Sequence, residues 1–265
     1  MTILGRTLSL SVTKIMDFGY YLESGDEFGE VLLPKKHALE RYEIDDEVEV
    51  FIYLDSSDKP IATTQKPKAE VGEFAFLTVT DTNRFGAFAD WGLDKEVMIP
   101  FAEQHKPLEV GHSYIVYLYI DKIDQRITGT TKIDKHIADE SPYPLKQGQT
   151  VGVIIANSTD LGIKAIINNT CWGLIHNSDI YEKLSFGQSK RAFIKQVRPD
   201  GKINLTLNGG GQTRDRDSQK IIAYLNEHGG SAPFHDKSDS KLISRVFGMS
   251  KNSYKKAIGG LYKSG

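Results

Sequence analysis

Three stretches of the chain repeat one β-rich pattern with a period of about 70 residues. The second copy is the clearest, with RFGAFAD at 84–90, VMIP at 97–100 and RITGT at 126–130. The first copy has DFGYYL at 17–22 and VLLP at 31–34, and the third has LGIKAI at 161–166 and WGLIHNS at 172–178. A repeat of this length indicates a tandem array of one small domain, not one large enzyme core.

The repeat predicts a mainly β fold, a tandem array of three five-stranded OB-type barrels with a C-terminal all-α winged-helix-like domain. The predicted domains span residues 1–66, 67–139, 140–210 and 211–265. Pro67 and the Pro142 to Pro144 stretch separate the barrels, because proline cannot donate to a sheet ladder. A run of glycines at 209–211 predicts a joint before the last domain.

Beyond this joint the apolar period changes from two residues to nearly four, which predicts three short helices. The first is expected to begin at the N-cap Asp217 and to end at Gly229. The second has an apolar face that stops at Gly248, and the third, a basic helix, starts after the cap Ser250.

Composition and cysteine content point to a soluble, cytoplasmic chain. The sequence has 39% hydrophobic and 26% charged residues, without a run of about 18 apolar residues or a basic-apolar leader. The single Cys171 cannot form an internal disulfide or supply a zinc site by itself, and we expect an inert, packed thiol. We therefore expect no membrane segment, no metal and no cofactor.

The near-zero net charge hides an asymmetry along the chain. Residues 1–139 carry 15 Lys and Arg against 25 Asp and Glu, whereas residues 140–265 carry 18 against 10. Basic surface at one end of a chain is typical of a protein that binds a polyanion.

Aromatic side chains beside the glycine of each repeat suggest what that polyanion is. We expect the glycine to permit a β-bulge that coils the sheet, so that Phe85 and Phe88 both face outward. Exposed aromatics on a small barrel can stack on unpaired bases, at about 1–3 kcal/mol per base. Phe74, Leu77 and Val79 are expected in the core instead.

FGAF at 85–88 with Arg126, and GLIHNSDI at 173–180, resemble the RNA-binding S-one domain, the repeat of ribosomal protein S-one. Three such domains followed by a winged helix resemble one bacterial family, the YitL-like proteins, also called conserved virulence factor B. The resemblance implies an RNA-binding regulatory protein without catalytic activity. The family's β-hairpin wing is not found before Gly265, so the wing is either reduced or cut off.

The resemblance also implies which positions contact RNA: the aromatic before the repeat's glycine, the aromatic two positions after it, and a histidine. No copy has the full set, which indicates that aromatic and cationic roles are divided among the copies. The three sets are Phe18, Tyr21 and Pro34; Phe85, Phe88 and Pro100; and Leu161, Lys164 and His176.

We expect the main RNA contact in the third barrel, with Trp172 either in that surface or in the core. The other candidates are Arg84 beside Phe85 and the cationic helix near the C-terminus. The predicted RNA-binding residues are Phe18, Tyr21, Arg84, Phe85, Phe88, Lys164, Trp172, His176, Lys190, Arg191, Lys195, Arg198, Lys251, Asn252, Lys255 and Lys256.

Three interpretations of function remain open at this point. The first is a non-catalytic protein that binds single-stranded RNA and influences translation or gene expression. The second is a DNA-binding transcription regulator, and the third is a protein-interaction scaffold at the ribosome. Enzyme motifs such as a phosphate-binding loop or a His-Glu-x-x-His zinc site do not occur, which leaves only a metal-dependent nuclease on Asp45, Asp46 and Glu47 as a minor alternative.

Overall fold

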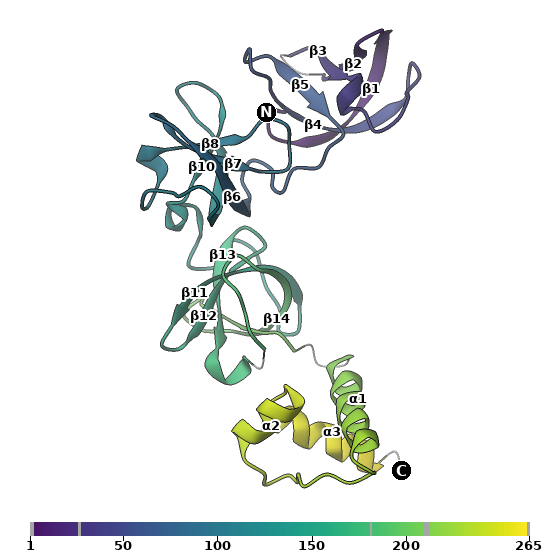
Figure 1. Ribbon diagram of the computed structural model, residues 1–265, viewed down its shortest axis with the longest axis vertical. Coiled ribbons are helices and arrows are strands. Elements are labelled where there is room, and N and C mark those ends of the chain that lie inside the picture. The colour runs from purple at the N-terminus through teal and green to yellow at the C-terminus, as the bar shows by residue number, and fades with distance from the viewer. Residues whose placement is uncertain (1–2, 26–27, 181, 209–211, 264–265) are drawn as a thin grey trace. The chain divides into compact units, whose positions relative to one another are not determined.

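The computed structural model of the chain describes residues 3–25, 28–180, 182–208 and 212–263, with the side chains of 212–216 and 263 left undescribed (Figure 1). The chain divides into two compact units, Met1–His136 and Ile137–Gly265. The first unit holds two barrels, and the second holds the third barrel and the helices.

Each repeat folds into a closed five-stranded barrel, which confirms the predicted fold class. The third strand of each barrel pairs in parallel with the fifth, and the other pairs are antiparallel. The strands of the first barrel are β1 (Thr7–Met16), β2 (Gly19–Glu23), β3 (Glu30–Pro34), β4 (Glu47–Leu54) and β5 (Pro60–Thr63). Those of the second are β6 (Phe74–Thr82), β7 (Gly86–Asp90), β8 (Val97–Pro100), β9 (Ser113–Ile120) and β10 (Ile127–Thr130). Those of the third are β11 (Thr150–Thr159), β12 (Gly162–Ile167), β13 (Cys171–His176), β14 (Ser189–Val197) and β15 (Ile203–Thr206).

Alternating apolar residues fill each barrel. In β11, Val151, Val153 and Ile155 point inward, at the spacing of two that places side chains on one face of a strand. Phe74, Leu77 and Val79 are buried as predicted. Cys171 lies in the core of the third barrel, where burial raises the pKa of its thiol.

The repeat's glycine has a different role from the one expected. The bulge lies in the first strand of each barrel, for example between Val79 and Asp81 of β6, and not at the glycine. A Cβ on Gly86 would lie 2.3 Å from the carbonyl oxygen of Ile99, and the equivalent glycines are as tightly placed. The glycine is needed because the second strand starts in close contact with the backbone of the third. The corresponding clashes are 2.5 Å for Gly19 with Leu33 O and 2.1 Å for Gly162 with Ile175 O.

The helical module consists of α1 (Gln212–Glu227), α2 (Ser240–Phe247) and α3 (Lys251–Lys263). Its core contains Ile221, Ile243, Phe247 and Tyr254. Among the described residues, no helix is long and apolar enough to span a membrane.

Three of the four predicted helix boundaries are confirmed and one is wrong. The first helix ends at Glu227, just before Gly229. Gly248 ends α2 with φ 60°, and Ser250 Oγ accepts a hydrogen bond from Ser253 N at 2.9 Å. Asp217 is not an N-cap, because α1 starts earlier and Asp217 is buried within it. The N-cap that the sequence analysis missed is Asp239, whose carboxylate accepts from two backbone amides of α2. The predicted glycine joint at 209–211 lies outside the described residues.

Candidate nucleic-acid interface

The strand register aligns the outer faces of the three barrels residue by residue. In the third barrel, Lys164 of β12 lies opposite Leu174 of β13, which lies beside Asn204 of β15. Each of these residues is flanked along its strand by neighbours that point into the core, so the row faces outward. The equivalent rows are Phe88, Met98 and Thr128 in the second barrel, and Tyr21, Leu32 and Ile61 in the first.

On the third barrel this outer face contains an open pocket of about 510 Å³. The pocket is built from β12, β13, the turn between β11 and β12 and the turn between β14 and β15. These are the elements with which OB-folds hold oligonucleotides. The cationic side chains in its lining are Lys164, Arg198 and Lys202.

Lys164 and Trp172 form the centre of this pocket. The Lys164 Nζ atom lies 3.9 Å from the centroid of the Trp172 ring, in a cation–π contact. Trp172 is 9% exposed, so the indole is nearly buried and yet lines the pocket. The ring of Trp172 therefore packs on the barrel and also lines the pocket, where it lies beneath the Lys164 amine. Among the described residues, no carboxylate forms an ion pair with Lys164.

The other predicted residues of the third barrel are divided between two surfaces. His176 lies two positions beyond Leu174 on the same outward row, where its Nε2 is 3.1 Å from Asn204 Oδ1. Arg198 lines the pocket but is also paired with Asp200 at 3.0 Å. Lys190, Arg191 and Lys195 lie on β14, outside the lining of this pocket.

Two of these three β14 cations are engaged in ion pairs. Lys190 pairs with Glu182 at 2.7 Å, and Lys195 pairs with Asp179 at 2.6 Å. The basic residues predicted in the third barrel therefore do not all line this pocket. Lys202, which the sequence analysis did not select, lies in the pocket instead, and its position in the tight β14–β15 turn is the signal that could have identified it.

The predicted aromatics of the first two barrels reach the surface. Phe85 is 58% exposed and lies under the Arg84 guanidinium, at 4.7 Å from the ring centroid. Phe18 is 54% exposed and meets Tyr21 edge-on at 6.4 Å. Phe88 is half-buried and lines a smaller pocket of the second barrel. Both Phe85 and Phe88 thus face outward, as expected.

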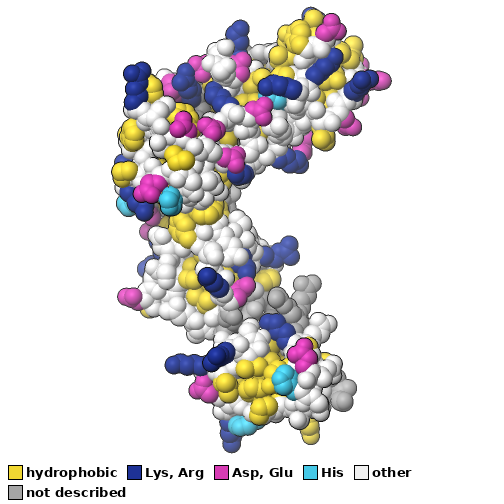
Figure 2. Space-filling model, viewed as in Figure 1, with side chains coloured by type: hydrophobic (Ala, Val, Ile, Leu, Met, Phe, Trp, Pro, Cys, Tyr) yellow, Lys and Arg dark blue, Asp and Glu magenta, His cyan; other side chains and the backbone are white. Residues whose placement is uncertain are grey.

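The helical module carries further cations, and in the view of Figure 2 Lys and Arg side chains lie around a hydrophobic patch of this module. Asn252, Lys255 and Lys256 are exposed on α3, whereas Lys251 is half-buried and donates to Lys237 O at 3.2 Å. The sequence analysis missed the contribution of α2, since Lys241 and Arg245 line one groove together with Lys251 and Asn252. Lys241 and Arg245 lie on α2, which the sequence analysis described only by its apolar face. The turn at Gly248 brings them beside α3.

Comparison with known proteins agrees with this architecture. The profile of the S1 domain, which is the S-one repeat and a nucleic-acid-binding type of domain, matches residues 4–65 and 71–132. The profile of the CvfB-like winged helix domain matches residues 219–265.

Similar proteins extend over nearly the whole chain. The protein YitL of Bacillus subtilis is 29% identical over 98% of this chain and 89% of its own length. Conserved virulence factor B of Staphylococcus epidermidis is 29% identical over 92% of this chain and 85% of its own. A crystal structure of a multidomain protein with nucleic acid binding domains from Streptococcus pneumoniae is 27% identical, covers 100% of this chain and 95% of its own, and has a TM-score of 0.45. The chain therefore combines S1 domains with a CvfB-like winged helix domain, and it is similar to YitL and conserved virulence factor B over nearly its whole length.

Proposed function

We propose that the protein is a non-catalytic regulator of gene expression that acts in the cytoplasm and binds single-stranded RNA, mainly through the outer face of the third barrel. The observation that carries this proposal is the pocket in which Lys164 lies over Trp172, with Arg198 and Lys202 at its edge. Cations beside an aromatic ring suit an unpaired strand, because phosphates meet the amines and bases stack on the ring.

The composition of this surface favours single strands over duplex. The pocket is concave and offers a ring and several amines, whereas a duplex hides the faces of its bases. Binding of this kind is tolerant of sequence, since every base has a π-face. The helical module adds the cations of α2 and α3 as a second contact for phosphates.

The test is a fluorescence-anisotropy titration of the full chain with a labelled U-only RNA at several salt concentrations. A Lys164→Ala/Lys202→Ala variant is compared with Lys190→Ala/Arg191→Ala, which removes the same number of cations from β14. The first variant is expected to weaken binding and to reduce the salt slope by about 0.7 per lost phosphate contact, and the second to change neither.

Two outcomes would contradict the proposal. An equal loss of RNA affinity in both variants would mean that binding depends only on the net charge of the third barrel. Tighter binding of duplex DNA than of the U-only RNA would favour the DNA-binding alternative, with α2 and α3 as the contact.

A further inference from the structure

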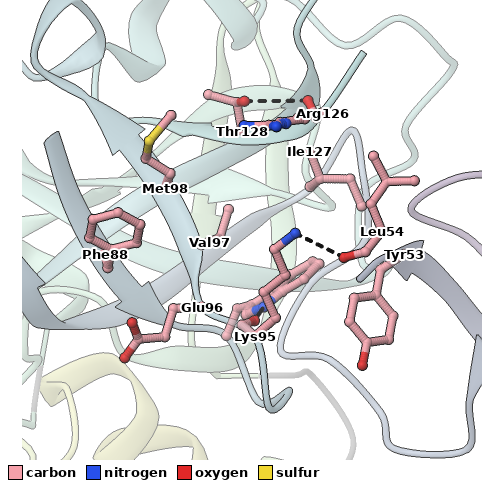
Figure 3. Close-up of a pocket in the computed structure, with 11 residues that line it drawn as sticks. Tyr53, Leu54, Phe88, Lys95, Glu96, Val97, Met98, Arg126, Ile127 and Thr128 are labelled. Carbon is pink, nitrogen blue, oxygen red and sulfur yellow. Dashed lines mark hydrogen bonds between the residues drawn. The ribbon is translucent and has the colours of Figure 1, made fainter. Parts of the chain in front are cut away.

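The first two barrels enclose a small pocket with a largely apolar lining (Figure 3). Its volume is about 130 Å³. Phe88 and Met98 of the second barrel contribute to one side, and Tyr53 and Leu54 at the end of β4 in the first barrel lie on the opposite side of this view. Trp91, Val97 and Ile127 complete the apolar lining.

Polar contacts between the barrels hold the two sides together. The Lys95 Nζ atom donates to the carbonyl oxygen of Leu54 at 3.0 Å (Figure 3). It also donates to the carbonyl oxygen of Asp55 at 2.8 Å. Arg126 forms an ion pair with Asp58 in the turn between β4 and β5. Partial burial lowers the pKa of Lys95, as expected for an amine at such a junction. All residues that line the pocket therefore belong to the first unit.

Most polar groups that line the pocket already form hydrogen bonds within the protein. The remaining free polar group therefore determines which ligand can bind. Trp91 Nε1 donates to Lys95 O, and Thr128 Oγ1 donates to Arg126 O at 3.3 Å. The Lys95 amine donates to the carbonyl oxygen of Leu54. Glu96 is exposed at the edge of the pocket and makes no ion pair with another described residue. Its carboxylate can only accept hydrogen bonds, so the ligand has to present donors.

From this lining we propose that the pocket binds one unpaired guanine base of an RNA strand, stacked on Phe88 with its Watson–Crick edge on the carboxylate of Glu96. Guanine is the base that presents two adjacent N–H donors on that edge, which match the two oxygens of a carboxylate. The volume is well below the range of about 300–1,000 Å³ of pockets for drug-sized ligands, so it suits one ring system and leaves the sugar and phosphate outside.

The aligned barrels show why this site differs from that of the third barrel. The position of Glu96, diagonal to Phe88, corresponds to that of Trp172, diagonal to Lys164. In the third barrel this diagonal brings the two side chains to 3.9 Å, so groups at these two positions can act on one ligand. The third barrel thus has a cation and a ring for any nucleotide, whereas the second has a ring and a carboxylate for one kind of base edge. The acidity of the first two barrels is compatible with such a site, because a base carries no charge.

The proposal rests on the RNA-binding function proposed above, and the test separates the two. The full chain is titrated with short labelled RNAs of equal length, one of U only, one with a single central G and one with a single central A. The wild type is expected to bind the G-containing RNA about tenfold or more tighter than the other two, in line with a bidentate contact.

Glu96→Gln, on an exposed side chain, is expected to abolish this preference while U-only binding is unchanged. Phe88→Ala is expected to weaken G binding further. The matched control is Glu30→Gln, at the equivalent position of the first barrel, where the carboxylate is already engaged by Thr13 Oγ1 at 2.8 Å. This control should keep the preference for G.

Retention of the preference in Glu96→Gln, or no preference in a wild type that binds U-only RNA normally, would overturn the pocket proposal alone. If no RNA binds at all, the proposed function fails, and guanosine monophosphate tests the pocket directly through the methyl NMR signal of Met98. A shift that saturates in the wild type and not in Glu96→Gln would support the site, and no shift would overturn it.

Discussion

At the scale of single residues, close backbone contacts determine what the chain tolerates. Gly86 begins β7 where a Cβ would meet the Ile99 carbonyl oxygen at 2.3 Å, so neither strand can yield without losing hydrogen bonds of the barrel. In contrast, a Cβ on Gly259 of α3 would have no atom within 4 Å. Two glycines of one chain thus have opposite sensitivity to the same substitution.

Gly86→Ala is expected to lower the free energy of unfolding of the first unit by about 1–3 kcal/mol, because the added methyl overpacks the barrel. Gly259→Ala is expected to raise that of the second unit by about 0.5–1 kcal/mol, because alanine favours the helix. Urea unfolding followed by circular dichroism checks both. Equal effects of the two changes would mean that the close approach at Gly86 is relieved at no cost.

Cys171 gives a second prediction at this scale. Its thiol is fully buried and its pKa is raised, so little thiolate is present at neutral pH and reagent cannot reach it. A disulfide reagent such as dithionitrobenzoate is expected to react with it only when urea unfolds the third barrel. Fast reaction of the folded protein would show that the barrel opens locally at β13.

At the scale of elements, the first two barrels share a core. Phe51 and Tyr53 of β4 pack in the hydrophobic cluster of the second barrel. His37, in the turn after β3, is buried beside them, with Nε2 at 3.0 Å from Asp94 Oδ2 and Nδ1 at 3.5 Å from the Tyr53 hydroxyl. Burial, followed by the nearby Asp94 and Asp55, raises the pKa of Tyr53 to about 12.

His37→Phe is expected to destabilise the first unit by about 1–3 kcal/mol, because the buried Tyr53 hydroxyl loses this partner. Lys36→Ala, which removes an exposed ion pair to the same Asp94, is the control, with an expected loss of about 0–1 kcal/mol.

Acid should reduce the advantage of the wild type over His37→Phe. The hydrogen bond from His37 holds the pKa of Asp94 below its usual value, so this contribution is present above pH ~4 and is lost as the pH falls through the lowered pKa. Urea midpoints at several pH values measure it. A difference that grows toward low pH would contradict this assignment.

At the scale of the whole molecule, the chain consists of two units with separate cores and opposite charge. The first unit contains the two shared-core barrels, and the second contains the clusters of the third barrel and of the helices. The acidic part of the chain holds the small base-sized pocket, and the basic part holds the open pocket lined by cations.

Separate cores predict separate unfolding transitions. Each unit contains one of the two tryptophans, Trp91 in the second barrel and Trp172 in the third. Urea unfolding of Trp172→Phe and Trp91→Phe by fluorescence should therefore give two different midpoints. Coincident midpoints in both variants would show that the two units unfold as one.

The number of barrels, their mainly β class, the S1 and winged-helix domain types and most helix ends could be predicted from the sequence alone. These depend on local signals, namely alternation, a recurring glycine and capping residues, which are close together in the chain. The start of α1 was misjudged because Asp217 has the residue type of a cap but is buried in a helix that begins earlier.

Which charged groups are free of ion pairs could not be predicted from the sequence, because the ion-pair partners are brought together only by the fold. Lys190 and Lys195 resemble Lys164 in the sequence, but carboxylates from the segment before β14 pair with them and leave Lys164 over Trp172. Glu96 became a candidate ligand-binding residue only because the fold places it at the edge of a pocket. The first barrel closes that pocket through contacts such as the one between Arg126 and Asp58, which are 68 residues apart. Ion pairs and pocket walls are formed by residues that are distant in the sequence. A local sequence pattern does not indicate which of these distant residues come into contact.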